Sequence, residues 1–141
     1  MAYCTKDDIL EQLDEETLLQ LTDDYGVGQV DDNKVTRAIA DADATIDAYC
    51  QGRYEIPLSP VPPKIRNLSV DLAIYHIYSR REEVTPEIRK DRYREAMRFL
   101  KDVAGGKAQL GAATPAAKTT GDSVEIEQSD RMFTRDKLKG F

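Results

Sequence analysis

The sequence predicts an all-α fold: three long helices, shorter N-terminal helices, and an extended C-terminal arm. Apolar residues recur every three or four positions in three long stretches, and helix-starting or helix-stopping residues flank these stretches. After residue 106, Ala, Thr, Gly and Lys dominate without helical periodicity. At 141 residues the chain is long enough for one domain. We therefore expect a helical domain over residues 1–106 and a linker with a docking arm over 107–141.

Two short helices are expected at the N-terminus. Thr5 and Asp8 have the spacing of a capping box, with Asp in place of Glu. Asp14 is placed to cap a second helix over residues 15–21. Residues 23–32, which include Gly26-Val27-Gly28, are typical of a loop.

The first long helix is predicted from Asp31 or Asp32 to about Gln51. Its apolar face holds Val35, Ala38, Ile39, Ala42, Ile46, Tyr49 and Cys50. Asp43 and Asp47 lie on another face, four residues apart, where carboxylates could hold a cation or act as an acid–base pair. Acids on an amphipathic helix usually form a solvated face, and we interpret this pair so.

The second long helix, over residues 64–81, is expected to be the central and most buried one. Four prolines within residues 57–63 make the preceding segment a stiff, extended connector, and Pro63 can occupy the first helical turn. The apolar face is broad and includes Ile65, Leu68, Leu72 and Tyr75. His76 is the only histidine, so it cannot form a multi-histidine metal site, and a structural or surface role is expected.

The third long helix is predicted over residues 87–104, after Thr85-Pro86 and before Gly105-Gly106. Its inward residues should be Ile88, Tyr93, Ala96, Met97, Leu100 and Val103. Its outward face should carry bases among the acids Asp91, Glu95 and Asp102, and these bases are Arg89, Lys90, Arg92, Arg94, Arg98 and Lys101. Residues 80–101 hold eight bases and five acids, a mixture too balanced for a strong phosphate-binding surface.

The C-terminal residues are predicted to form a flexible linker, then a segment that docks on a partner. Residues 124–127 could form a short strand. The final eleven residues add basic and apolar side chains that have little chance of entering the core unaided. They include Arg131, Phe133, Arg135, Leu138 and Phe141.

Charge and composition exclude several classes of protein. The net charge of −6 and the 40% hydrophobic content exclude a disordered acidic chain and a generic basic nucleic-acid binder. Residues 1–53 carry a net charge of −9 and residues 54–141 one of +3, which suits head-to-tail contact between copies. Cys4 and Cys50 are read as reduced thiols. No signal peptide or membrane span is expected, so the chain should stay in the cytoplasm where it is made.

No catalytic signature is present in the sequence. It has no GxxxxGK[ST] phosphate loop and no GxSxG elbow, and Gly26-Val27-Gly28 lacks the third glycine of a dinucleotide fingerprint. We therefore expect no catalytic residues, no metal site and no cofactor, and no enzymatic function.

Several segments together resemble the Mu-like phage and prophage neck proteins. They are Tyr3-Cys4-Thr5-Lys6-Asp7-Asp8-Ile9, the Ala-Asp-Ala-Thr-Ile-Asp-Ala-Tyr of residues 42–49, Gly52-Arg53-Tyr54, Pro57-Leu-Ser-Pro-Val-Pro-Pro63 and the ending at residues 131–141. The resemblance covers essentially the whole chain. It implies a small helical head–tail connector, also called an adaptor or head completion protein, which forms a ring at the portal–tail junction.

The resemblance further implies that the ring closes the filled capsid and docks the tail. The expected partners are copies of the chain, the portal protein, and the tail or next neck protein, with DNA passing through the channel without sequence-specific binding. The arm would insert Phe133, Leu138 and Phe141 into a groove on a neighbour or the portal. The expected location is the virion neck, reached from the host cytoplasm during assembly.

Two alternatives stay open at this point. An acidic channel lining would let DNA slide, whereas a rival lining would be basic and formed by Arg89, Arg92 and Arg98. The alternative function is a phage-encoded DNA-binding or packaging accessory protein.

Overall fold

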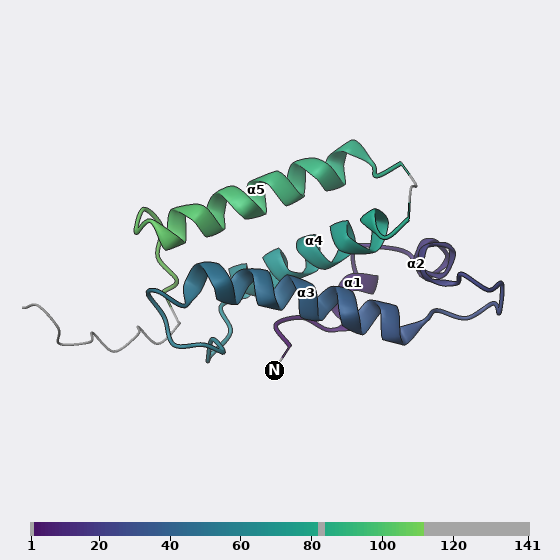
Figure 1. The fold of residues 1–141 in the computed structure, drawn as a ribbon, viewed down its shortest axis with the longest axis horizontal. Coiled ribbons are helices and arrows are strands. Elements are labelled where there is room, and N and C mark those ends of the chain that lie inside the picture. Colours follow the sequence, from purple (N-terminus) through teal and green to yellow (C-terminus); the bar gives the residue numbers. More distant parts are fainter. Residues whose placement is uncertain (1, 82–83, 112–141) are drawn as a thin grey trace, which may run out of the picture.

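Helix α4 (Pro63–Ser79) forms the centre of the structure, with α3 (Asp32–Cys50) and α5 (Glu87–Ala104) packed against it (Figure 1). This computed structural model describes residues 2–81 and 84–111. Two short helices, α1 (Lys6–Leu10) and α2 (Glu15–Thr22), contact α4 as well. Helices are the regular elements throughout the described residues, so the prediction of an all-α fold is confirmed.

Helix α4 is buried because apolar residues surround much of its circumference. An amphipathic helix buries one stripe, whereas a helix that is apolar on several sides is covered on several sides. The buried apolar residues of α4 are Ile65, Leu68, Val70, Leu72, Ala73, Ile74 and Ile77. The expectation that this helix is the central one is therefore confirmed.

The helix starts follow from local capping chemistry. Thr5 and Asp8 form the predicted capping box, in which each side chain accepts from the other residue's backbone N–H. The carboxylates of Asp14 and Asp31 accept from the first turns of α2 and α3. Pro63 opens α4, where its missing N–H costs nothing.

The proline-rich connector contributes to the core. Tyr54 and Leu58 are buried, and Leu58 has no exposed surface. The Tyr54 hydroxyl also accepts a hydrogen bond from the backbone N–H of Leu110 at 2.8 Å. Leu110 is itself buried, so the chain stays packed on the bundle for several residues beyond the end of α5.

Helix α5 buries Ala96, Leu100 and Val103 as predicted, but its N-terminal half departs from the prediction. Ile88, expected to face inward, is 60% exposed. Arg89 and Arg92, expected to face solvent, are partly buried and bind the segment after α1. The Arg92 guanidinium also lies 3.7 Å from the Asp71 carboxylate on α4. Both guanidinium groups therefore have polar partners within the subunit.

Candidate interaction surfaces

A loop of residues 23–31, called loop 23–31, extends from the bundle between α2 and α3 (Figure 1). Its first residue organises the turn, because the Asp23 carboxylate accepts from the N–H groups of Val27 at 2.9 Å and Gly28 at 2.8 Å. These hydrogen bonds, chiefly the one from Gly28, lower the pKa of Asp23. Gly26 and Gly28 have φ of 69° and 80°, a region that favours glycine.

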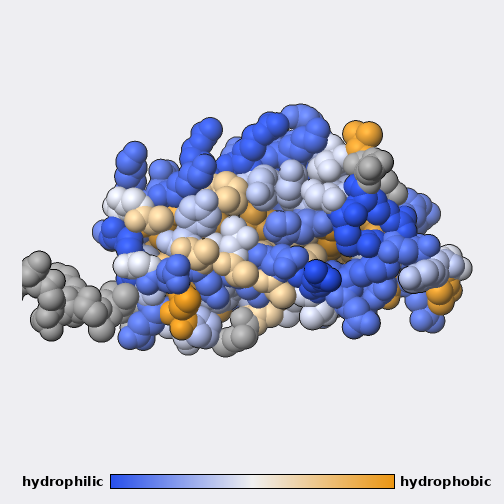
Figure 2. Space-filling view, in the orientation of Figure 1, coloured by the Kyte–Doolittle hydropathy of each residue, from blue (hydrophilic) through white to orange (hydrophobic). Residues whose placement is uncertain are grey.

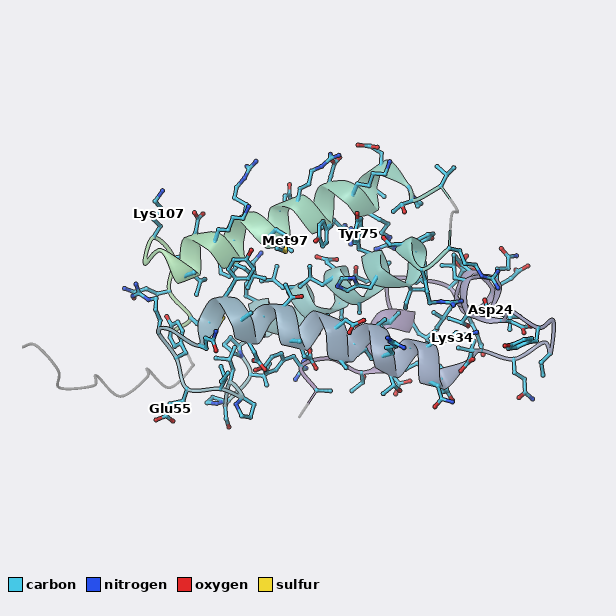
Figure 3. The ribbon with its side chains drawn as sticks, in the orientation of Figure 1. Asp24, Lys34, Glu55, Tyr75, Met97 and Lys107 are labelled. Atoms are coloured by element: carbon cyan, nitrogen blue, oxygen red, sulfur yellow. The ribbon has the colours of Figure 1, made fainter. Side chains whose placement is uncertain are left out.

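A cluster of ion pairs holds the base of the loop. The Asp24 carboxylate contacts Lys34 on α3 and both Arg80 and Arg81 beyond α4 (Figure 3). The Arg80 guanidinium donates to its two oxygens at 3.0 and 2.6 Å and also reaches the Leu21 carbonyl. Hydrogen bonds from Arg80, then Lys34, hold the pKa of Asp24 well below its usual range. We call these four residues the loop anchor.

The tip of the loop presents apolar side chains to solvent. Tyr25 is 88% exposed and Val27 is 70% exposed. Figure 2 shows an apolar spot at this end of a mostly hydrophilic surface. The loop is thus fixed at its base while its largest side chains gain little burial from their own subunit.

The exposed side of α5 carries a broad, shallow hollow of about 610 Å³, called the α5 hollow. It is lined by Tyr93, Arg94, Met97, Arg98 and Lys101. The Tyr93 ring stacks on Tyr75 of α4, with 3.9 Å between the ring centroids. Arg94 is paired with Glu87 and Asp91, whereas Arg98 and Lys101 make no ion pair with any residue that the structure describes. The hollow combines an aromatic and thioether floor with unpaired cations.

The three predicted basic residues of α5 do not form one surface. Arg89 and Arg92 both donate to Gln12, at 2.8 Å to its carbonyl and 2.7 Å to its side chain. Only Arg98 is exposed among the three. The five predicted arm residues, the linker beyond residue 111 and the strand at 124–127 lie outside the described residues. The arm residues are Arg131, Phe133, Arg135, Leu138 and Phe141.

Interpreting Asp43 and Asp47 as a solvated face was wrong. The Tyr3 hydroxyl donates to Asp47 and accepts from the Leu58 N–H at 3.0 Å. The Asp43 carboxylate accepts from the Tyr3 N–H at 3.2 Å and the Ser69 hydroxyl at 2.9 Å. Burial raises the pKa of both Tyr3 and Asp43. We call Tyr3, Asp43, Asp47 and Ser69 the N-terminal anchor.

His76 lies beside the stacked rings of Tyr75 and Tyr93 rather than in a cluster of ligands. Its ring meets Tyr75 and Tyr93 edge-on, and burial lowers its pKa. It also borders a pocket of about 360 Å³, whose other lining residues are Lys34, Arg37, Ala38, Asp41 and Arg80. Across residues 2–81 and 84–111, no group of three His, Cys, Asp or Glu side chains is placed to hold a metal ion. In the same part of the chain, no helix has the length and apolar character of a membrane span.

Comparison with known sequences places this architecture among phage proteins. The chain is similar to the Mu-like prophage FluMu protein gp36 of Haemophilus influenzae, with 29% identity over 99% of this chain and 97% of that protein. It is also similar to gene product J of Escherichia phage Mu, with 34% identity over 81% of this chain and 79% of that protein. The sequence profile of the family "Bacteriophage Mu, Gp36" matches residues 3–128, and the chain therefore belongs to that family.

Proposed function

We propose that this protein is a structural, non-enzymatic component of a phage particle. Copies of it form a ring at the portal–tail junction, which closes the filled head and docks the tail. Membership of a phage Mu family and the two unlike surfaces of the subunit support this role. The surfaces are the apolar-tipped loop 23–31, which follows the acidic helix α2, and the basic α5 hollow.

The unlike surfaces are the observation that carries the proposal. A closed ring needs heterologous contacts, in which one patch of a subunit meets a different patch of the next. Residues 11–32 contain eight acids and no bases. The α5 hollow contains three bases and no acid. Opposite charges at the two patches favour the head-to-tail arrangement and disfavour contacts between identical patches.

The position of the ring at the portal–tail junction implies its remaining partners. The portal lies on one side of the ring and the tail or the next neck protein on the other. DNA passes through the channel without sequence-specific binding. Residues 131–141 dock on a neighbouring subunit or the portal through Phe133, Leu138 and Phe141, with Arg131 and Arg135 pairing with acids nearby. The mature location is the virion neck, and the protein is in the host cytoplasm during assembly.

Electron microscopy of a lysate from a phage that lacks this gene tests the role. We expect filled or leaking heads separate from tails, and rescue by the full chain supplied from a plasmid. A chain that ends at Gly111 lacks the arm but retains Leu110, which is buried in the core. This truncated chain therefore tests the arm separately from the helical bundle. It should fold and fail to join heads to tails. Normal tailed particles from the deletion would overturn the proposal.

A DNA-binding or packaging accessory protein is the second candidate. The exposed Arg98 and Lys101 favour it, because cations without a protein partner can contact phosphates. This candidate requires salt-dependent binding of duplex DNA by the purified chain, and that binding should weaken in Arg98→Ala.

A further inference from the structure

We propose that loop 23–31 of one subunit docks into the α5 hollow of the next subunit, with Tyr25 and Val27 seated against Tyr93 and Met97. The proposal rests on the proposed ring and names the surfaces that join its subunits. Its occupant is a second copy of this chain.

The loop is organised for binding before it meets a partner. Asp23 closes the turn through two backbone hydrogen bonds, and Asp24 ties the base to α3 and α4. Ordering a flexible segment costs free energy on association, and a segment already held in shape avoids most of that cost. Tyr25 and Val27 are therefore presented on a rigid base, although nothing in their own subunit covers more than a small part of them.

The hollow offers matching chemistry. Aromatic residues, Met and Arg are enriched where proteins meet, and Tyr93, Met97 and Arg98 supply all three kinds of residue. Tyr93 is supported from below by Tyr75, so the floor is fixed in place. The apolar tip of a loop can pack on Tyr93 and Met97, while the cations at the edge of the hollow remain outside this apolar contact.

Charge complementarity selects this occupant. The arriving loop belongs to residues 11–32, which contain eight acids and no bases. Within the loop, Asp24 and Asp31 are already paired with Lys34, so the acids available to Arg98 and Lys101 are exposed ones outside it, such as Glu15 and Glu16 on the first turn of α2. Arg98, Lys101, Glu15 and Glu16 make no ion pair within the part of the chain that the structure describes. Such pairing steers the approach of a subunit and fixes its orientation.

The two surfaces are also far enough apart to make a chain of subunits. Figure 3 shows Asp24 and Lys34 at the base of the loop, at one end of the bundle, and Met97 on α5 well away from them. One subunit cannot bury its own loop in its own hollow. Repeated contacts of this kind form a closed ring when the rotation between subunits closes.

Cysteine cross-linking in assembled particles tests the contact. Val27→Cys and Met97→Cys are introduced together into the full chain, which complements the deletion phage. Cys4 and Cys50 are buried, and burial raises the pKa of each thiol to about 11, so they should not react. Mild oxidation should give a ladder of dimers and higher multimers on a non-reducing gel. Each single variant should give no ladder.

The matched control is Val84→Cys with Met97→Cys, because Val84 is 89% exposed and stands outside the proposed contact. Tailed particles that contain the chain but give no ladder from the Val27–Met97 pair, or an equal ladder from the Val84 pair, overturn this docking and leave the ring intact. Tailed particles that lack the chain altogether overturn the proposed function instead.

A second set of variants removes the dependence on cysteine geometry. The double variant Tyr25→Ser and Val27→Ser should lower the yield of tailed particles at least about tenfold without lowering the melting temperature. Arg98→Glu with Lys101→Glu should do the same, and Arg66→Glu, an exposed arginine away from the hollow, should not. Unchanged yields overturn the docking. If only the Arg98 and Lys101 change lowers the yield, and binding of duplex DNA falls with it, the face binds DNA and the docking is likewise overturned.

Discussion

The N-terminal anchor and the loop anchor hold two irregular segments by different kinds of interaction. Each uses carboxylates to fasten an irregular segment to the helices. The N-terminal anchor buries Tyr3 to 2% exposure and uses hydroxyl and backbone donors. The loop anchor stays at the surface, where the Asp24 side chain is 27% exposed, and uses Lys34, Arg80 and Arg81.

The difference teaches which segment serves the fold and which is available to a partner. Burial of the Tyr3 ring stabilises the subunit, and its hydroxyl must be hydrogen-bonded because an unpaired polar group in the interior would be costly. Exposed ion pairs add little to the free energy of unfolding. Several ion pairs around one carboxylate nevertheless fix the orientation of the loop that carries it. The N-terminal anchor therefore holds the bundle together, and the loop anchor aims Tyr25 and Val27 outward.

The largest effect is expected for Tyr3→Ala. The change removes a buried ring and both hydrogen bonds of its hydroxyl, and we expect unfolding free energy to fall by about 3–5 kcal/mol. Urea denaturation followed by circular dichroism measures it. Tyr3→Phe keeps the ring and should lose only about 1–3 kcal/mol. Equal losses in the two variants would show that the ring itself packs poorly.

A smaller loss is expected for Ser69→Ala. Asp43 loses a hydroxyl donor in a buried site, which costs about 1–3 kcal/mol. The same donor lowers the pKa of Asp43 against the effect of burial, so the pKa should rise further in the variant, as measured by NMR titration. Ser79→Ala, at the exposed end of α4, is the control and should change stability by less than about 0.5 kcal/mol. An unchanged Asp43 pKa would contradict the hydrogen bond.

Asp24→Asn tests the loop anchor through its pH dependence. Hydrogen bonds, first from Arg80, lower the folded-state pKa of Asp24 below its ordinary value of 3.8. The carboxylate thus contributes stability fully above pH 3.8, and this contribution is lost as pH falls through the lowered value. The difference in melting temperature between wild type and variant should be present at pH 7 and shrink toward pH 2. High salt should also reduce it, and a gap that is constant with pH would contradict the ion pairs.

The smallest effect on stability is expected for Tyr25→Ala. The ring is 88% exposed, and the Lys34 ammonium lies 5.6 Å from the ring centroid. The unfolding free energy should fall by less than about 1 kcal/mol. Thermal unfolding with Val84→Ala as an exposed control measures the change. A loss as large as that of Tyr3→Ala would mean that loop 23–31 belongs to the core of the subunit.

Local rules predicted most of the fold. The caps at Thr5, Asp14 and Asp31 depend on residues within three positions, and the predicted starts of the first three helices are confirmed. The loop was predicted from its glycines, and the turn around Asp23 is equally local. The central position of α4 followed from its broad apolar face.

Long-range partners could not be predicted from the same patterns. Tyr3 meets Asp43 across 40 positions, and Arg89 meets Gln12 across 77. Helical periodicity gives the angle of a side chain about its own helix but not what lies opposite, so Asp43 was assigned to solvent and Ile88 to the core. The Asp24 cluster joins residues 56 and 57 positions apart and escaped prediction for the same reason.

The packing of Leu110 has a mechanical consequence. Its side chain is buried and its N–H donates to the Tyr54 hydroxyl, so Leu110 is a fixed point of the chain after α5. A pull on the residues that follow would reach this point first and pass into the proline-rich connector and α4. A load carried along the chain would therefore be shared by segments that lie 56 residues apart in sequence.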